Sequence, residues 1–345
     1  MEEARLRRTA LLAEETYTGL QRRFEGARIE EASSTPDVRV LDAALTPIRP
    51  AKNRAPLVVL LFFVGALGLA STGAVVMDRL DPRLRYPDQV SRDMGLTILG
   101  TVPHLKTRGG QYRLSRDEAA EVVEALRGVC LNLVYSHGGA GPLLVTVSSP
   151  GAGDGKSFLC ANLALTFADG GHRTLLIDAD LRRGVLHQRF RASRRPGLSD
   201  CLRGESPLES VIRPTPFASL SFLSCGSRTH SAPELLGSAA MTRLMEQVRA
   251  NYDVVIVDSP PLSAGIDPCI LGALTGNLLM VLRTGVSHRE LASAKLEMLS
   301  RFPLRLLGAI LNDVPPTGSY RYYSYYLPGY SGEEEDSEKR PRELV

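Results

Sequence analysis

Residues 143–157 read LLVTVSSPGAGDGKS, and the architecture expected of this chain follows from them. The first seven residues are apolar or small, which is typical of a strand buried on both faces of a parallel sheet. A glycine-rich turn, Lys156 and Ser157 follow, and the helix-forming stretch SFLCANLALTFADGG begins at that serine. Strand, glycine turn, lysine, serine and helix in this order are what a phosphate-binding P-loop requires.

The chemistry of such a loop assigns a role to most of its residues. Backbone N–H groups face the anion, and the helix N-terminus adds its partial positive charge. We expect Lys156 to reach the β- and γ-phosphates of ATP and Ser157 to bind Mg²⁺. Pro150 stands where the strict G-x-x-x-x-G-K-[ST] pattern has glycine. The predicted nucleotide-binding residues are Gly151, Ala152, Gly153, Asp154, Gly155, Lys156, Ser157 and Phe158.

Two more apolar runs end in carboxylates. TLLIDADLRR places Asp178 and Asp180 after a strand pattern, and DVVIVDSPP places Asp258 after another. Ligands of open α/β sheets bind beyond the carboxyl ends of the strands. An aspartate at such a place is also a common turn former or helix cap, so each one alone is a weak signal. Three of them beside a Gly-Lys-Ser loop predict Mg-nucleotide chemistry.

The rest of this region continues the alternation of strands and helices. NLLMVLRTG (277–285) and LLGAILND (306–313) predict two further strands. The helix between them is predicted to begin after Ser287 as N-cap, with Glu290 at the third helical position. Alternating strands and helices imply a doubly wound parallel α/β sheet with right-handed crossovers. We therefore expect a P-loop NTPase domain over residues 121–316.

A membrane segment precedes this domain. Residues 55–77 are 23 residues without a charge, and about 20 helical residues cross a bilayer. Residues 3–32 have apolar positions at three- and four-residue steps, which predicts a helix. Four basic residues lie within twenty positions on each side of the span, so charge leaves the orientation open. We expect a helical, proline-rich segment over 1–54 and a juxtamembrane linker over 78–120.

Composition narrows the possible functions. With 41 basic and 38 acidic residues the net charge is +3, so no global field draws the chain to nucleic acid. The five cysteines are scattered singly, which indicates reduced thiols without a disulfide scaffold or a structural zinc site. The six histidines show no ligand spacing either. Six of the eleven tyrosines fall within 320–330, ahead of a polar terminal segment in the predicted tail 317–345.

These motifs together resemble those of the bacterial tyrosine autokinases of capsule and exopolysaccharide export. SSPGAGDGKS resembles the Walker A motif of that family, LLIDADLRR its Walker A′ motif and VVIVDSPP its Walker B motif. SAPELL, residues 231–236, resembles a further family segment. The N-terminal part resembles the end of a chain-length determinant (polysaccharide co-polymerase) module, whose last membrane helix leads into a cytoplasmic kinase.

The resemblance implies roles for individual residues. The catalytic set would be Lys156, Asp178, Asp180 and Asp258, with Lys156 clamping phosphate and Asp178 as the base for the attacking phenol. The metal ligands would be Ser157, Asp180 and Asp258, holding Mg²⁺. The implied phosphoacceptors are Tyr320, Tyr322, Tyr323, Tyr325, Tyr326 and Tyr330.

The resemblance also implies a setting in the cell. It places residues 78–345 in the cytoplasm and 1–54 outside the bacterial inner membrane. The implied partners are further copies of the chain, the polysaccharide polymerase and export machinery, and a cognate tyrosine phosphatase. Phosphate would pass from ATP to the tyrosine tail of a neighbouring subunit and so regulate assembly.

The chain departs from the family pattern in two places. The family helix E-x-x-R-x-x-R, which packs subunits into a ring, keeps Glu124 and Arg127 here but has Cys130 at the second arginine. The first membrane helix and most of the extracytoplasmic module have no counterpart, which suggests a truncated gene, a fragment or a mis-assigned start.

Two other functions stay open at this point. A partition-type ATPase would carry a signature lysine where this chain has Gly151. A non-enzymatic export scaffold would bind nucleotide without turning it over.

Overall fold

The computed structural model describes residues 2–33, 53–105, 107–108, 111–112, 116–139 and 141–315. The chain divides into two compact units, Met1–Ala74 and Val75–Val345. The predicted tail 317–345, with its six clustered tyrosines, lies outside the described residues.

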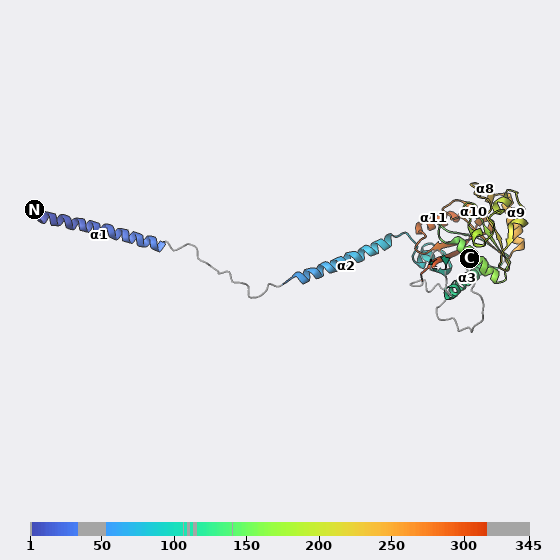
Figure 1. Ribbon diagram of the computed structural model, residues 1–345, viewed down its shortest axis with the longest axis horizontal. Helices are drawn as coiled ribbons and strands as arrows, with labels where there is room; N and C mark the ends of the chain where they lie inside the picture. The colour runs from blue at the N-terminus through green and yellow to red at the C-terminus, as the bar shows by residue number, and fades with distance from the viewer. Residues whose placement is uncertain are drawn as a thin grey trace. The chain divides into compact units, whose positions relative to one another are not determined.

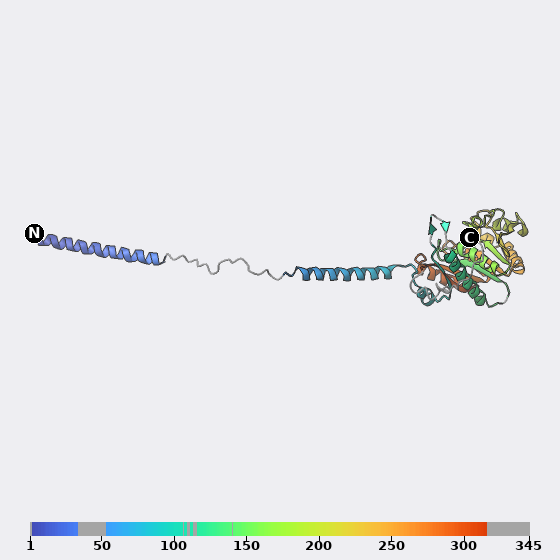
Figure 2. The same ribbon diagram turned by 60° about the horizontal axis from the view of Figure 1, so that its bottom comes forward.

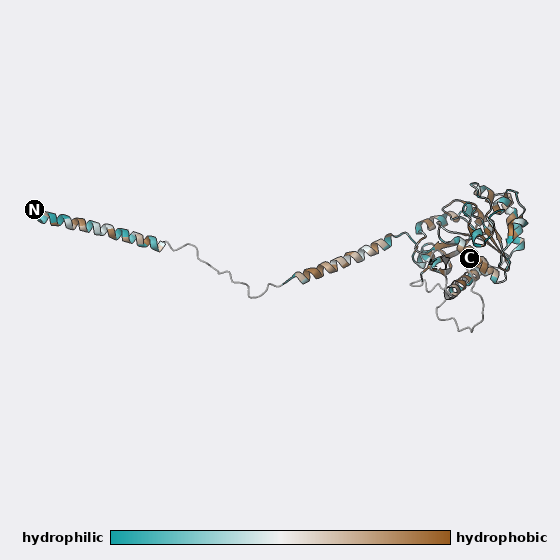
Figure 3. Cartoon of the chain, viewed as in Figure 1, coloured by the Kyte–Doolittle hydropathy of each residue, from teal (hydrophilic) through white to brown (hydrophobic). Residues whose placement is uncertain are grey.

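Two long helices form the N-terminal part, as the sequence predicts. Helix α1 (Glu2–Ser33) has no buried residue, and helix α2 (Ala55–Leu80) has none either. Figure 3 shows apolar residues along most of α2 and mixed polarity along α1. At about 1.5 Å per residue α2 extends about 39 Å, more than the hydrocarbon core of about 30 Å. It is therefore long and apolar enough to cross a membrane.

The second unit is built on an eight-stranded sheet in the order β1-β10-β9-β4-β8-β5-β7-β6. All neighbouring strands are parallel except the edge pair β6–β7, which is antiparallel. This order confirms the predicted doubly wound class and adds one antiparallel edge strand. The strands are β1 (Ile98–Pro103), β4 (Leu143–Ser148), β5 (Thr174–Asp178), β6 (Ile212–Pro214), β7 (Leu220–Leu223), β8 (Val254–Asp258), β9 (Asn277–Arg283) and β10 (Arg305–Val314); β2 (Thr107–Arg108) and β3 (Gln111–Tyr112) form a separate antiparallel pair.

Helices cover both faces of this sheet. The faces are distinguished by alternation along each strand: Val145 and Val147 of β4 pack into one apolar cluster, and Leu144 packs into another. Figures 1 and 2 show α3 across the sheet from α8, α9 and α10. The first face carries α3 (Arg116–His137) and α4 (Lys156–Asp169); the second carries α8 (Ala232–Leu236), α9 (Ala239–Asn251), α10 (Asp267–Thr275) and α11 (Arg289–Leu299). Short helices complete the unit: a π-helical turn (Gln89–Asp93), α5 (Leu186–Arg189), α6 (Leu198–Leu202) and α7 (Leu208–Val211).

The segment 78–120, expected to be a linker, contributes to the sheet domain. Strand β1 pairs in parallel with β10, with Ile98 opposite Ala309. Leu84 and Val90 are fully buried in the core. At Gly100 an added Cβ would lie 2.5 Å from Cγ2 of Val129, so α3 packs closely on β1. Strand β1 was not predicted because its residues lie within a segment rich in Arg, Asp, Gly and Pro, and its partner strand lies about two hundred residues along the chain.

Candidate active site

Three neighbouring strands end at one edge of the sheet. Strand β8 lies between β4 and β5, and Asp258 at its end is the register partner of Val147 on one side and Asp178 on the other. The glycine loop follows β4 directly. Parallel pairing thus brings together the glycine loop and the two acidic strand ends that the sequence predicts to act together.

The glycine loop depends on residues without a side chain. Gly153 and Gly155 have φ angles of +88° and +91°, a region that L-residues rarely adopt. A Cβ on Gly155 would also lie 2.1 Å from Nδ2 of Asn312. The backbone conformation and the close Asn312 side chain therefore both favour glycine at residue 155, the N-cap of helix α4.

The backbone N–H groups of this loop suit an anion. Gly151 donates its N–H to Oδ2 of Asp154 at 3.2 Å. Within the described part of the chain, the N–H groups of residues 153–157 donate no hydrogen bond. They also precede or open a 14-residue helix, whose N-terminus carries partial positive charge. The residues present therefore match the needs of a nucleotide phosphate.

Lys156 places its ammonium group beside the start of the glycine loop. The residue is 8% exposed, and Nζ donates a hydrogen bond to Oγ of Ser149 at 3.1 Å. An ammonium group has three donors, so the donors beyond this bond are available to phosphate oxygens. Ser157 follows on the first turn of α4, and its side chain lies close enough to Asp258 to lower the pKa of that carboxyl.

Asp178 and Asp258 are both buried. Burial, and then the negative charge of Asp258, raises the pKa of the Asp178 carboxyl well above its ordinary value. Burial also raises the pKa of Asp258 to about 6, although a hydrogen bond from Ser157 and the charge of Lys156 act to lower it. Neighbouring carboxyls in a site shielded from water favour a proton or a cation between them.

Asp180 lies close to this pair but is partly exposed. Its Oδ1 accepts hydrogen bonds from the N–H groups of Arg182 and Arg183, at 3.2 and 2.8 Å. Its charge adds to the rise in the pKa of Asp258, so the three predicted aspartates interact at one edge. Arg182 of the D-x-D-x-R pattern pairs with Asp267 of α10, with Nε and Oδ2 3.4 Å apart.

Sequence reasoning missed the residues that support the glycine loop. Asn312 donates from Nδ2 to the carbonyl of Asp154 at 2.9 Å, and Arg283 donates from Nη1 to the carbonyl of Gly153 at 3.0 Å. Ser287 donates from Oγ to Oδ1 of Asp154 at 2.8 Å. Asn312 lies near the end of β10 and Arg283 ends β9, so the rule that singled out the aspartates could also have found these two.

The predicted cap at Ser287 is wrong. Helix α11 begins at Arg289, and its N-cap is His288 without a side-chain cap. The Ser287 hydroxyl instead bonds to Asp154 and accepts from the N–H of Arg283 at 2.8 Å. The physical reason is that a hydroxyl committed to the glycine loop cannot also satisfy the first turn of α11.

The segment that follows α2 is hydrogen-bonded to the residues around Ser287. The N–H of Leu84 donates to the carbonyl of Ser287 at 2.8 Å, and the N–H of Gly285 donates to the carbonyl of Leu84 at 2.7 Å. The chain leaving the apolar helix is thus hydrogen-bonded to the segment that supports the glycine loop.

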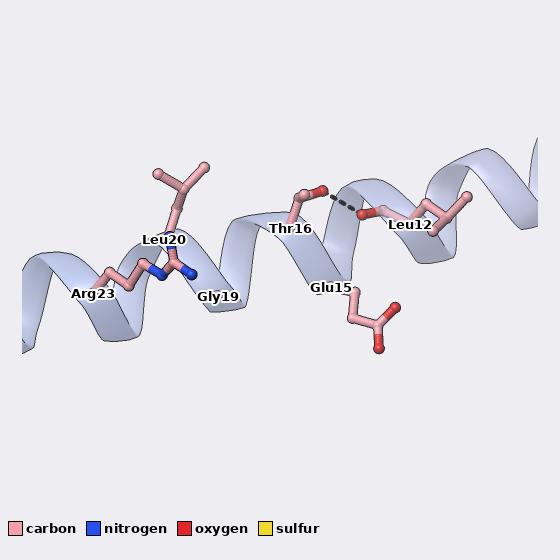
Figure 4. A pocket seen from close by; sticks show the side chains of 6 residues that line it. All are labelled: Leu12, Glu15, Thr16, Gly19, Leu20 and Arg23. Carbon is pink, nitrogen blue, oxygen red and sulfur yellow. Dashed lines mark hydrogen bonds between the residues drawn. The ribbon is translucent and has the colours of Figure 1, made fainter.

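Helix α1 carries a shallow concavity of a different kind. Figure 4 shows that all its lining side chains come from this one helix, and that the Thr16 hydroxyl bonds to the carbonyl of Leu12. On a surface formed by consecutive turns of one exposed helix, the polar groups do not point toward a common ligand position. Its lining residues are Leu12, Glu15, Thr16, Gly19, Leu20 and Arg23.

Two protein-family models match the chain. The model described as "AAA domain" matches residues 144–281, which include the glycine loop and both acidic strand ends. The model described as "G-rich domain on putative tyrosine kinase" matches residues 2–79, which include α1 and most of α2.

Similar proteins extend these matches. The chain is 33% identical over 349 residues to "Putative tyrosine-protein kinase EpsB" of Ralstonia nicotianae, an alignment covering 95% of this chain and 46% of that protein. The solved structure "BceF Tyrosine Kinase Domain" is 32% identical, with a TM-score of 0.60, and the match covers 68% of this chain and 100% of that one. The kinase domain of Escherichia coli tyrosine kinase ETK is 28% identical, with a TM-score of 0.62 and coverage of 72% and 100%. The chain spans about half the length of the curated relatives it matches.

Proposed function

The chain belongs to the family of bacterial tyrosine kinases, and on that premise we propose that it transfers the γ-phosphoryl group of ATP to tyrosine hydroxyls, including its own. One observation is the main support for the proposal. A glycine loop with unused N–H donors and a buried lysine lies beside three interacting aspartates at one sheet edge. Phosphoryl transfer depends mainly on positioning and charge neutralisation, and this edge offers both.

Each side chain of the edge has a task in the proposal. Lys156 and the loop N–H groups bind the phosphates, within the predicted stretch from Gly151 to Phe158. Ser157, Asp180 and Asp258 would hold Mg²⁺, and they are the hydroxyl and carboxylate ligands that this ion prefers. When bound, Mg²⁺ would neutralise negative charge on the phosphate oxygens.

Asp178 is proposed to act on the phenol. A tyrosine hydroxyl has a pKa of about 10 and is a weak nucleophile until it loses its proton. The phenol oxygen bonds to the γ-phosphorus, the bond to the β–γ bridging oxygen breaks, and ADP leaves. The phenolic proton goes to the Asp178 carboxylate, whose raised pKa makes it a stronger base.

We infer that the acceptors are the six tyrosines of residues 320–330, which lie outside the described residues. Each phosphate adds about −1.5 to −2 charges, so a multiply modified tail repels its neighbours. Transfer between subunits would then separate copies that the unmodified tail holds together. The names of the relatives and the G-rich family match support the tyrosine-kinase assignment. The resemblance of the motifs to those of the capsule and exopolysaccharide autokinases supports a role in exopolysaccharide or capsule polymerisation and export, with the polymerase machinery and a phosphatase as partners.

The apolar helix α2 supports an inner-membrane location. The proposed orientation puts the sheet domain in the cytoplasm, where ATP is available.

The test is phosphosite mapping on the full chain in detergent with Mg-ATP. We expect phosphate on the 320–330 tyrosines. Lys156→Met is expected to reduce labelling by at least about 100-fold, because it removes a buried ammonium group that would donate hydrogen bonds to the phosphate oxygens of ATP. Lys295→Met on α11 is the matched control and is expected to label normally. ATP hydrolysis with every tail tyrosine unmodified would replace the kinase proposal with an ATPase.

A mixing experiment tests transfer between subunits. The Lys156→Met chain supplies the tail, and an active chain with its six clustered tyrosines changed to phenylalanine supplies the active site. Labelling of the inactive chain is expected. An unlabelled inactive chain beside a wild-type chain that labels itself would restrict transfer to one subunit.

A further inference from the structure

A second cluster of chemically reactive side chains adjoins Asp178. Asp178, His187 and Cys225 each offer one donor atom, and these three atoms lie within 4.8 Å of one another. They come from the end of β5, from α5 and from the second residue after β7. The sequence showed no metal-ligand spacing because the sheet order, and not the sequence, brings these segments together.

The cluster is shielded, and one of its donors is unused. Asp178 and Cys225 are 0% exposed. Nδ1 of His187 is a buried atom without a hydrogen-bond partner among the described residues, and such an atom calls for an explanation. The Cys225 thiol contacts the carbonyl of Gly226 at 3.9 Å, and the Arg194 side chain lies beside it.

The loop over the cluster brings the acid and the thiol together. A Cβ on Gly184 would lie 2.6 Å from each oxygen of Asp178 and 2.6 Å from Sγ of Cys225. All three atoms therefore converge on one point, and residue 184 can pass there only as glycine. The chain is folded so that carboxylate and sulfur face the same small volume.

We propose that Asp178, His187 and Cys225 bind a thiophilic divalent cation of the zinc type. Zinc takes sulfur, nitrogen and oxygen donors at about 2.0–2.3 Å, which puts tetrahedral ligands about 3.2–3.8 Å apart. Separations of up to 4.8 Å need side-chain shifts of about 1 Å or less to close on the ion. Mg²⁺ prefers oxygen ligands in an octahedron, so the donor set separates this site from the proposed Mg²⁺ site.

The charges around the cluster allow this occupant. Binding forms a metal–sulfur bond, and the thiol proton leaves to solvent. A thiolate and the Asp178 carboxylate then balance the two positive charges of the ion. Burial, and then the charges of Arg194 and Arg228, lowers the pKa of His187, so the imidazole is neutral, which is the form that binds metals. The two arginines oppose a cation, Arg194 from beside the Cys225 thiol, and the thiolate formed on binding offsets their effect.

One consequence rests on the proposed function. Asp178 is the proposed base for the tyrosine phenol, so a cation bound to it would prevent proton transfer. The site would make the kinase sensitive to inhibition by zinc, whereas metal binding itself does not depend on the kinase assignment.

The binding test uses the untagged full chain in detergent, without nucleotide or Mg²⁺, and with Co²⁺ and Zn²⁺ as probes. We expect one Co²⁺ per chain with a thiolate-to-cobalt charge-transfer band that Zn²⁺ removes. Cys225→Ser is expected to abolish the band, and His187→Gln to weaken binding at least about tenfold. The matched controls Cys201→Ser and His172→Gln are expected to bind as wild type, since neither residue belongs to the cluster. Absence of the band, or a band that survives Cys225→Ser, overturns the site.

An activity test separates the two proposals. Zn²⁺ is expected to inhibit tyrosine labelling of the wild type, and Cys225→Ser is expected to raise the inhibitory concentration at least about tenfold. If zinc binds through Cys225 but labelling continues, the shared use of Asp178 is overturned while the metal site stands. If no labelling occurs without zinc, the proposed function fails, and the cobalt spectrum still decides the site. Thermal unfolding of Cys225→Ser shows whether the variant is folded, and His187→Gln tests the site if it is not.

Discussion

The glycine loop after β4 and the aspartate loop after β5 meet at the same sheet edge but are held in different ways. The glycine loop is supported from outside, by Asn312, Arg283 and Ser287. The aspartate loop is supported mainly by its own carboxylates: Asp178 accepts from the N–H groups of Asp180 and Leu186, at 3.3 and 3.2 Å.

This difference shows where each loop can be disturbed. The aspartate loop contains its own hydrogen-bond acceptors, so its short motif specifies most of its shape. The glycine loop contains the groups that bind phosphate, but residues about 130 to 160 positions along the chain set its conformation. Changes far from the P-loop in sequence should therefore alter nucleotide binding, which Ser287→Ala tests. Two further variants probe the glycine loop itself and the acid between the two loops.

The largest effect is expected where the external support meets the loop backbone. Gly155→Ala puts a Cβ 2.1 Å from Nδ2 of Asn312 at a φ of +91°, so either the loop or the Asn312 side chain that supports it must move. We expect a loss of about 2–4 kcal/mol in the free energy of unfolding and no measurable ATP binding. Denaturant titration and nucleotide titration measure the two quantities.

Gly171→Ala is the control for backbone strain. Its φ is +85°, but nothing lies within 4 Å of the added Cβ. We expect it to cost about 1 kcal/mol with normal ATP binding. Equal losses in the two variants would mean that strain alone, without Asn312, explains the effect.

An intermediate effect is expected at Asp258, between the two loops. Burial raises its pKa to about 6, so the folded state holds the proton more tightly than the unfolded chain does. This contribution to stability is present below pH 4 and is lost as the pH rises through about 6. Asp258→Asn resembles the protonated acid and should be more stable than wild type by about 2–3 kcal/mol at pH 7, with little difference at pH 4.

Denaturant titrations across this range, with a chelator and without nucleotide, measure the difference. Asp93→Asn changes an exposed acid and should show no such trend. A stability difference that stays constant between pH 4 and pH 7 would contradict the buried-acid account.

The smallest effect is expected from one external hydrogen bond. Ser287→Ala removes the donor to Oδ1 of the buried Asp154. Loss of that bond should cost about 1–2 kcal/mol and weaken ATP binding up to about tenfold. Ser300→Ala, whose hydroxyl donates to the carbonyl of Glu297 on α11 at 2.7 Å, is the matched control. Unchanged affinity in Ser287→Ala would show that the other two supports suffice.

Prediction from the sequence succeeded where the signal is local. Strands β4, β5, β8, β9 and β10 are apolar runs followed by glycine, aspartate or asparagine, and the structure has a strand at each. Strands β1, β6 and β7 were missed, since ILGTVP, IRP and LSFL lack a clear strand pattern. Strands of this kind at or next to a sheet edge form because a partner strand is present, which the local sequence does not reveal.

What the sequence by itself determined was the set of main elements and the chemistry of the P-loop, because hydrophobic period, glycine content and acidic strand ends act over a few residues. Only the tertiary structure decided which distant side chains meet. Asn312 reaches the glycine loop, and His187 and Cys225 reach Asp178, through strand order and register. Such contacts depend on how the sheet is assembled, and no short stretch of sequence encodes that assembly.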